Sequence, residues 1–488
     1  MPMEPVVAVT GGKISGRTVN GISAFLGVPY AAPPVGAALF QAPQPPVPWD
    51  GVRAAVEFGG SCPQAPYPPA LAAIFGVQTV PGAEALNVNV WTPDPGGSGL
   101  PVMVWIHGGA FTRGSNALPA YDGSAFARDG VVLVSLNYRL GAAGFAVLDG
   151  APSNRGLLDQ QYALAWVQEN IRGFGGDPDN VTVFGESAGA MSIAALLAAP
   201  SSAGLFAKAI MQSGNGEVVA SEADARKVSA EIAATLAIAP TAADFAAVPP
   251  EALLAAQEKT VADLIADTDP ARWGASVITG GLASMSLFPV LDGVVLHERP
   301  IDAIAAGSAR GIPLLIGHTS EEFRLFIVPT GVAAALTMDA LPFVLARYQL
   351  DASCLEPYIA QQPRASAGDL LAAVLTDHAF RFPARQLAHA QAATGTPVFA
   401  FEFAWRRVDQ DFGAFHALEL PFVFDTLAAV PALVGPDPAQ SVADEMHAAW
   451  VAFARTGDPG WPQDSAEHPS VRVFDAPAHP ASGVPVSP

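Results

Sequence analysis

Apolar runs of strand length recur through the first half of the chain, at residues 88–91, 102–106, 131–136 and 181–184. Between the last two runs, residues 157–167 repeat apolar side chains at the three- and four-residue spacing of a helix that buries one face. Strands that alternate with helices are typical of a mainly parallel sheet with helices on both faces. The pattern therefore predicts an α/β fold.

The second half of the chain continues the sheet and adds long helical segments. Residues 210–214 and 313–317 have the apolar character of further strands, whereas helix-prone insertions occupy about 217–280 and 325–395. No linker or internal repeat divides the chain, so we expect residues 1–488 to form one domain. Open α/β sheets bind ligands at the carboxyl edge of their strands, and we expect the two insertions to cap that edge.

A G-x-S-x-G pentapeptide, residues 185–189, lies where a predicted strand meets a helix-prone segment, 190–197. Glycines on both sides of the serine permit a tight strand-to-helix turn, and such a strained turn exposes the hydroxyl at the edge of the sheet. The pentapeptide could arise by chance in a chain with 46 glycines, but its flanks favour a nucleophile elbow. Ser187 is the candidate nucleophile.

A small-residue loop with the sequence HGGAF, residues 107–111, follows the apolar run that ends at Ile106. A loop of this kind, directly after a strand, offers backbone N–H groups to the oxyanion that develops during acyl transfer. We expect His107 to brace this loop.

A serine nucleophile needs a base and an acid, which in this type of fold follow it in the order Ser, Asp or Glu, His. His416 suits the base, because it lies in a loop-like stretch after the strand-like run 398–403. We expect surface or cap roles for three other histidines, which lie in helix-like segments: His378, His389 and His447.

Glu321 and Glu322 are the candidate acids, because they come soon after the predicted strand 313–317. Spacing alone does not choose between them. A surface carboxylate is the alternative interpretation of either residue.

The amino-acid composition limits the classes of protein to which the chain can belong. Apolar residues make up 51% and charged residues 14% of the chain, which indicates a large core. A formal net charge of −21 argues against nucleic acid and anionic membranes as partners. We find neither a run of about 18 apolar residues, as a membrane span needs, nor a secretory signal. Cys62 and Cys354 suggest neither a metal site nor a disulfide framework, so we expect a cytoplasmic protein without a metal ion.

Further motifs resemble those of one enzyme family along nearly the whole chain. They occupy residues 25–31, 33–36, 89–93, 137–139, 156–160, 175–178, 212–214, 289–293 and 453–457. On these motifs the chain resembles the type B carboxylesterases and cholinesterase-like α/β-hydrolases, and most of all their bacterial branch of the p-nitrobenzyl esterase type. The resemblance implies an α/β-hydrolase fold with a large, mainly parallel sheet and helical cap insertions.

The resemblance also implies roles that the residues alone leave open. It implies Ser187 as nucleophile, His416 as base and Glu322 as acid, since Glu322 fills the last position of the family's acid motif. It implies an oxyanion hole formed by the backbone N–H groups of Gly109, Ala110 and Ala188.

Four other positions bear on this assignment. Glu186 and Ser213 approach the catalytic residues in the family, but we assign them no catalytic role. The family's early disulfide is missing, because Cys62 matches its first half and Ala85 stands at its second. We expect the loop between them to be held only by packing and to act as a mobile gate.

These observations predict a serine carboxylesterase. It would hydrolyse small-molecule esters with a short to medium acyl group and an aryl or alkyl alcohol, through an acyl-enzyme and without a cofactor. One alternative is the same triad acting on carbamate or amide bonds. A more remote one is a non-catalytic binding protein of the same fold, against which the intact candidate residues argue. We expect a monomer or a small homo-oligomer.

Overall fold

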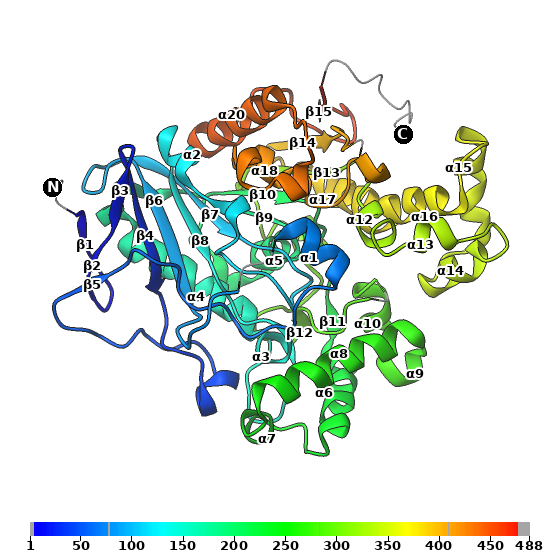
Figure 1. Ribbon diagram of the computed structural model, residues 1–488, viewed down its shortest axis with the longest axis horizontal. Coiled ribbons are helices and arrows are strands. Elements are labelled where there is room, and N and C mark those ends of the chain that lie inside the picture. The colour runs from blue at the N-terminus through cyan, green and yellow to red at the C-terminus, as the bar shows by residue number, and fades with distance from the viewer. Residues whose placement is uncertain (1–3, 77–78, 283, 408, 477–488) are drawn as a thin grey trace.

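A ten-stranded sheet forms the centre of the protein (Figure 1). The structure, a computed structural model, describes residues 4–476 except 77–78, 283 and 408. The first three N-terminal residues and residues 77–78 of the predicted gate loop therefore lie outside the described residues. From one edge to the other, the strands are β15 (Val471–Phe474), β14 (Val398–Phe403), β13 (Leu314–Thr319), β10 (Lys208–Gln212), β9 (Gly176–Glu186), β7 (Leu100–Ile106), β8 (Val132–Leu136), β6 (Asn87–Thr92), β4 (Ile22–Pro29) and β3 (Arg17–Val19).

The pairing of neighbouring strands changes once across this sheet, from parallel to antiparallel at β8. Every neighbouring pair from β15 to β8 is parallel, whereas β8, β6, β4 and β3 pair antiparallel. The sheet is mainly parallel, as the sequence predicts. The exception at β6 has a physical reason: residues 93–99, between β6 and β7, are too few for the crossover that parallel strands need.

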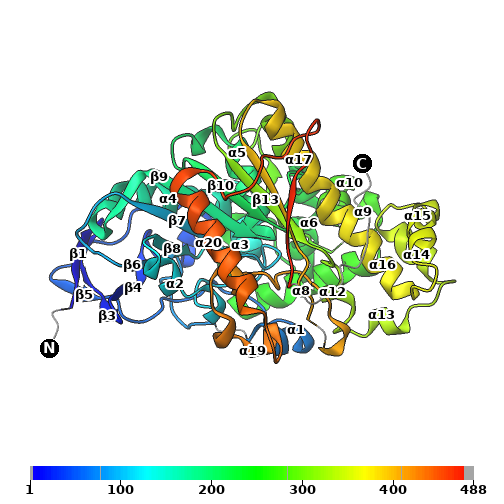
Figure 2. The same ribbon diagram turned by 90° about the horizontal axis from the view of Figure 1, so that it is seen from above.

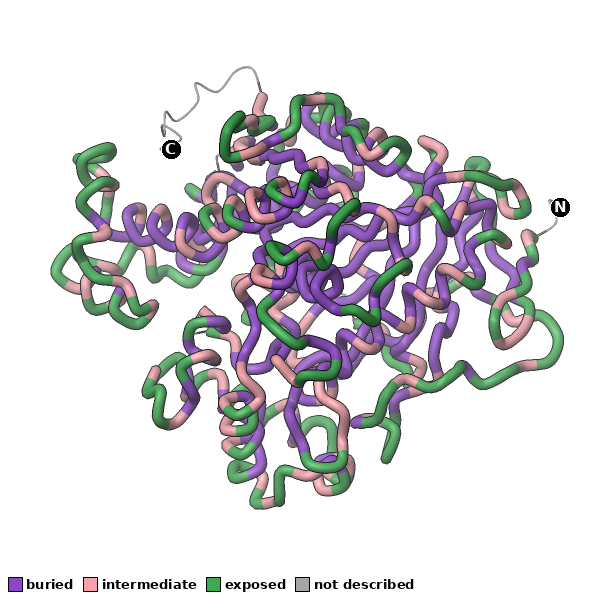
Figure 3. Tube along the Cα trace, turned by 180° about the vertical axis from the view of Figure 1, so that it is seen from behind, coloured by how far each residue is buried: buried purple, intermediate pink, exposed green. Residues whose placement is uncertain are grey.

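Strand β7 shows how the sheet separates two cores. Val102, Val104 and Ile106 belong to one buried cluster and Met103 and Trp105 to the other, because successive side chains point to opposite faces. The first face is covered by α4 (Arg155–Asn170), α5 (Ala188–Ala198), α11 (Pro300–Ala306) and α17 (Phe382–Ala393), and the second by α2 (Ser124–Arg128), α18 (Leu420–Val423) and α20 (Gln440–Thr456). Figure 2 shows α4, α5 and α17 of the first group and α2 and α20 of the second, and Figure 3 shows that the central strands are buried.

Two helical segments extend from the sheet (Figure 1). The first contains α6 (Glu222–Leu236), α7 (Ala242–Ala246), α8 (Pro250–Ala266), α9 (Pro270–Trp273) and α10 (Ala275–Gly280). The second contains α12 (Arg324–Ile327), α13 (Val332–Ala335), α14 (Leu341–Arg347), α15 (Glu356–Gln361) and α16 (Ala367–Thr376), and a π-helical turn, Asp377–Arg381, joins α16 to α17. Within the described ranges, no helix is long and apolar enough to cross a membrane.

Smaller elements complete the fold. They are a three-stranded sheet of β1 (Val6–Val9), β2 (Gly12–Ser15) and β5 (Val52–Ala54), the pair β11 (Ala220–Ser221) and β12 (Val290–Leu291), and helices α1 (Pro69–Phe75), α3 (Gly141–Phe145) and α19 (Pro431–Val434). Because β7, β9, β13 and β14 run in one direction, the segments that follow them emerge at one edge of the central sheet. The predicted site residues belong to those segments.

Candidate active site

Ser187 lies in the turn between β9 and α5, in a strained backbone conformation. Its φ of 54° and ψ of −122° belong to a region that residues other than glycine rarely adopt. Its N–H donates to the Gln212 carbonyl at 2.9 Å, and its carbonyl accepts from the Met191 N–H at 2.8 Å. Backbone hydrogen bonds on both sides therefore hold the turn.

The two glycines of the pentapeptide are required by packing. A Cβ atom on Gly185 would lie 2.7 Å from the Ile106 carbonyl oxygen, and one on Gly189 would lie 2.0 Å from the same oxygen. Both distances are far below van der Waals contact, so a larger residue at either position would displace the end of β7 or the start of α5.

The loop after β7 lies directly against this turn. A Cβ atom on Gly108 would lie 3.1 Å from Ser187 Cβ and 2.6 Å from Glu186 Oε2. The next three residues have positive φ values of 113°, 54° and 59°. Three such residues in succession give the loop an unusual path, and strained backbone of this kind occurs at functional sites.

The three backbone N–H groups predicted to bind an oxyanion have no hydrogen-bond acceptor among the residues that the structure describes. They belong to Gly109, Ala110 and Ala188. Ala188 is the first residue of α5, where an N–H has no partner within the helix and the helix dipole favours negative charge. The loop and the helix can thus offer free donors beside Ser187.

His416 and Glu322 are in direct contact, although 94 residues separate them. Nδ1 of His416 lies 2.6 Å from Glu322 Oε2, and the other Glu322 oxygen accepts from the Thr319 N–H at 2.8 Å. Burial of Glu322 by itself raises the pKa of its carboxyl, but the charge and hydrogen bond of His416 outweigh this and hold that pKa below its usual value. Glu322 therefore stays ionised and can orient the imidazole.

Glu186 lies on the opposite side of the imidazole, with Oε1 2.9 Å from His416 Nε2. Burial lowers the pKa of His416, but Glu186 and Glu322 together raise it well above its ordinary value. Burial in turn raises the pKa of Glu186, against the opposing attraction of His416. The imidazole is thus held between two carboxylates.

The Ser187 hydroxyl forms no hydrogen bond within the described part of the chain. Of the three predicted triad residues, the structure brings His416 and Glu322 into contact. His416 Nε2 contacts the side chain of Glu186, the residue before Ser187, and not the Ser187 hydroxyl. Catalytic hydrogen bonds are often long or misaligned without substrate and tighten in the complex.

Comparison with known proteins shows the family to which this geometry belongs. The family model described as the carboxylesterase family matches residues 3–476. The chain belongs to the carboxylesterase family. It is a carboxylic ester hydrolase.

Individual proteins resemble the chain over nearly their whole length. The chain is 40% identical to the para-nitrobenzyl esterase of Bacillus subtilis (strain 168), with 96% of this chain and 95% of that protein covered. It is 34% identical to the phenmedipham hydrolase of Pseudarthrobacter oxydans, with 97% and 95% covered. The solved structure of a thermophilic para-nitrobenzyl esterase superimposes with a TM-score of 0.84 at 37% identity, covering 97% of this chain and 96% of that one. The fold is that of the α/β-hydrolases.

Several groups around His416 of this carboxylesterase were absent from the sequence prediction. The rings of Phe380 and Phe326 lie 4.9 and 5.3 Å from the His416 ring, measured between centroids. Glu419 is fully buried, with Oε1 accepting from Gln212 Nε2 at 2.9 Å. Burial, followed by the charges of nearby carboxylates, raises the pKa of Glu419 to about 8. In the sequence, only the position of Glu419 three residues after His416 could have indicated that it lies near that histidine.

The structure bears on two further predictions, that His107 braces its loop and that a strand covers residues 210–214. The His107 ring stacks on Tyr138 with centroids 4.7 Å apart, and burial lowers the pKa of His107 to about 4, so a neutral imidazole packs beneath the loop. Ser213 is buried at the end of β10 with a φ of 53°, which explains why this strand ends at Gln212, before the end of the predicted run.

The predicted gate loop begins at Cys62, whose sulfur lies 3.9 Å from the Ala85 carbonyl oxygen. The prediction that packing alone holds this loop is wrong. Gln64 Nε2 donates to the Gly114 carbonyl at 2.7 Å, and its Oε1 accepts from the Gly114 N–H at 2.9 Å. The loop is therefore hydrogen-bonded to the glycine-rich loop after β7, and its mobility stays a prediction.

Proposed function

We propose that this carboxylesterase uses Ser187 as nucleophile, His416 as base and Glu322 as acid. The observation that carries the proposal is the 2.6 Å contact between His416 and Glu322 at the sheet edge where the Ser187 turn also lies. The strained backbone of Ser187 supports the assignment, because it aims a hydroxyl out of the sheet.

Attack by Ser187 requires that His416 Nε2 accept the hydroxyl proton. In the resting geometry Nε2 faces Glu186, so the imidazole must be neutral and turned towards Ser187 before the reaction starts. Glu322 then stabilises the imidazolium that forms.

The oxyanion of the tetrahedral intermediate would be bound by the free N–H groups of Gly109, Ala110 and Ala188. His416 returns its proton to the departing alcohol, which leaves an ester between the substrate's acyl group and Ser187. Water, deprotonated by the same imidazole, attacks this ester and releases the carboxylic acid. The substrates we propose have a short to medium acyl group and an aryl or alkyl alcohol.

Hydrolysis of p-nitrophenyl butyrate by the wild type and by Ser187→Ala tests the nucleophile. The variant should lose several orders of magnitude in rate, as removal of a catalytic serine does. Ser308→Ala is the matched control, because Ser308 is exposed on the turn after α11. Wild-type activity that survives in Ser187→Ala would refute the assignment.

Cleavage of carbamates or amides by the same residues is the alternative in substrate class, because the leaving group is selected by the shape of the pocket. Rates on an ester and an anilide with the same acyl group distinguish the two. A faster anilide reaction would favour the alternative.

Four broader properties belong to the same proposal. We propose a single domain in which helices α6–α10 and α12–α16 cap the carboxyl edge of the sheet, whereas α17, at the end of the second predicted insertion, covers a face of the sheet. We also propose a cytoplasmic location, a monomeric or small homo-oligomeric state and no nucleic-acid partner. The net charge of −21 supports the last of these.

A further inference from the structure

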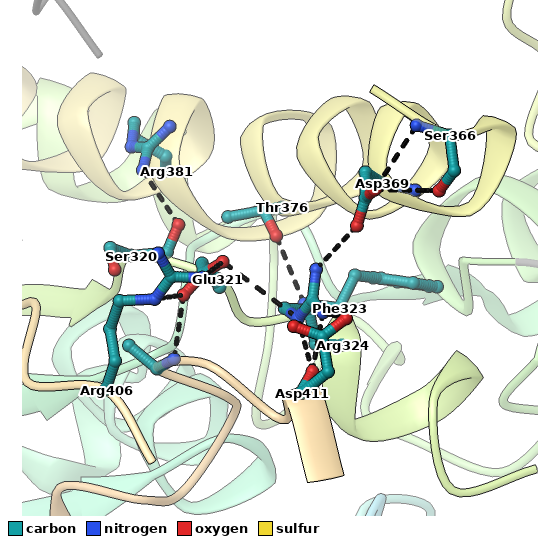
Figure 4. A network of polar contacts seen from close by, with 11 residues as sticks. Ser320, Glu321, Phe323, Arg324, Ser366, Asp369, Thr376, Arg381, Arg406 and Asp411 are labelled. Atoms are coloured by element: carbon teal, nitrogen blue, oxygen red, sulfur yellow. Dashed lines mark hydrogen bonds and ion pairs between the residues drawn. The ribbon is translucent and has the colours of Figure 1, made fainter. Parts of the chain in front are cut away.

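Residues 404–407 and 409–415 are the described part of the segment between β14 and His416, and the side chain of Glu321 lies against this base loop (Figure 4). Glu321 is the residue directly before Glu322, on the turn that follows β13. The two candidate acids of the sequence thus have different surroundings. Glu322 contacts the imidazole, whereas Glu321 contacts the loop that carries it.

The Glu321 carboxylate contacts two residues of the base loop. Oε1 accepts from Arg406 Nη2 at 2.9 Å. Oε2 lies 2.9 Å from Arg406 Nε and accepts from the Ala414 N–H at 2.9 Å. The Glu321 N–H also donates to the Ala414 carbonyl at 2.9 Å. Both backbone polar groups of Ala414 are therefore bound to Glu321, two residues before His416.

Gly413 lets this carboxylate approach the base loop. A Cβ atom at Gly413 would lie 2.3 Å from Glu321 Oε2, and the φ of 66° there is unfavourable for other residues. The loop is therefore shaped around the side chain of Glu321.

Arg324, one turn further along the chain, fastens the earlier part of the base loop. Its Nε and Nη2 donate to the Asp411 carbonyl at 3.1 and 2.5 Å, and Nη1 donates to Asp369 Oδ1 at 2.9 Å (Figure 4). Asp369 also takes part in the capping box of α16 with Ser366. The guanidinium is only 7% exposed, so these charge-assisted bonds form largely out of water.

Resting on the proposed roles of Glu322 and His416, we propose that Glu321 is a positioning residue for the base. Its carboxylate fixes the base loop to the turn that carries the acid, and so sets the distance between the imidazole and Glu322. The backbone bond from the His416 N–H to the Glu322 carbonyl is longer, at 3.3 Å. The shorter, charge-assisted contacts of Glu321 therefore define the alignment.

Glu321→Gln tests the proposal with little change in size. One of its two terminal atoms would be an NH₂ group, which would face an N–H donor of Arg406 or of Ala414, so at least one contact is lost. Because misplacement of a catalytic group by about 1 Å can cost about 100-fold, we expect kcat to fall by about 10- to 100-fold with KM nearly unchanged.

The rate is to be expressed per active site, counted by labelling Ser187 to completion with a fluorophosphonate. A merely structural role would lower the labelled fraction or the melting temperature and leave kcat per labelled site unchanged. Arg406→Gln provides a second variant, because its side chain is 39% exposed and its loss should not prevent folding. We expect a smaller fall in kcat there, since Ala414 still binds Glu321.

Glu445→Gln is the matched control, because it removes an exposed carboxylate that pairs with Arg472 on α20 and β15. Its kcat should equal that of the wild type. A kcat per labelled site within about twofold of the wild type in both Glu321→Gln and Arg406→Gln would overturn the proposal. Failure of the proposed function would appear separately, as activity that survives in Ser187→Ala.

Discussion

The turn that carries Ser187 and the pair formed by His416 and Glu322 are held by different means. The turn is fixed by backbone hydrogen bonds and by two glycines that lie against Ile106. The pair is fixed by side chains from segments that are 85 to 94 residues apart. The proposed nucleophile therefore depends on local backbone geometry, and the proposed base depends on a network of charges.

This difference has consequences for how each region tolerates change. A strained residue such as Ser187 persists only where its surroundings enforce the conformation, at a cost of about 1–3 kcal/mol. A buried charge network tolerates changes of shape but not the loss of one partner, which leaves another charge unpaired. Substitutions in the two regions should therefore differ in how they affect rate and folding.

Within the charge network, the largest effect is expected for Glu322→Gln. The amide oxygen can still accept from Thr319, so its NH₂ group would face His416 Nδ1. Nδ1 must then accept a hydrogen bond, which places the imidazole proton on Nε2, where the base needs a lone pair. We expect kcat to fall by about 10⁴-fold, as in other triads with this change.

Steady-state rates on p-nitrophenyl butyrate, with the far-UV spectrum as a check of folding, measure this loss. Glu321→Gln, at the preceding position, is the internal control and should lose much less. A loss of less than about tenfold for Glu322→Gln would remove Glu322 from the triad.

Gly189→Ala is the corresponding test of the turn. The added methyl would lie 2.0 Å from the Ile106 carbonyl oxygen, so α5 or the loop after β7 must shift. We expect kcat/KM to fall by about 100-fold and stability by about 1–3 kcal/mol. Rate and folding should change together here, because the added methyl displaces the backbone.

Gly204→Ala is the control for this second test. It has a positive φ of 81°, but an added methyl would meet open space. Thermal unfolding and kcat/KM of both variants separate the steric clash from backbone strain. Equal changes in thermal unfolding and in kcat/KM for the two variants would show that close packing at Gly189 does not define the turn.

The same contrast explains what could be predicted from the sequence. The sheet and the strand-to-helix turn at Ser187 were predictable, because apolar periodicity and a glycine pair at fixed spacing express local constraints. Glu321 and Glu322 could not be told apart by spacing, because their roles depend on which side chain meets a loop more than 80 residues away. The contact of Glu186 with His416 could not be predicted from the residues for the same reason, and only the family resemblance placed Glu186 near the catalytic residues.

Glu186 connects the two regions, because it ends β9 beside Ser187 and contacts the base. Glu186→Gln removes one of the two carboxylates that raise the pKa of His416. The base works only when neutral, so activity falls as the pH drops through its pKa. With that pKa raised in the wild type, the acidic limb of the kcat/KM profile should lie above pH 6.5, and it should move to lower pH in Glu186→Gln.

This shift is the smallest of the expected effects, because the variant retains Ser187, His416 and Glu322. A profile of kcat/KM on p-nitrophenyl butyrate from about pH 5 to 9 measures it, with Glu445→Gln as the control for loss of one negative charge. An acidic limb at the same pH in Glu186→Gln and in the wild type would mean that the Glu186 charge does not change the pKa of His416 in the free enzyme. A limb that moves to higher pH would mean that Glu186 favours the neutral imidazole, and the turn and the base would then be coupled by hydrogen bonding and not by charge.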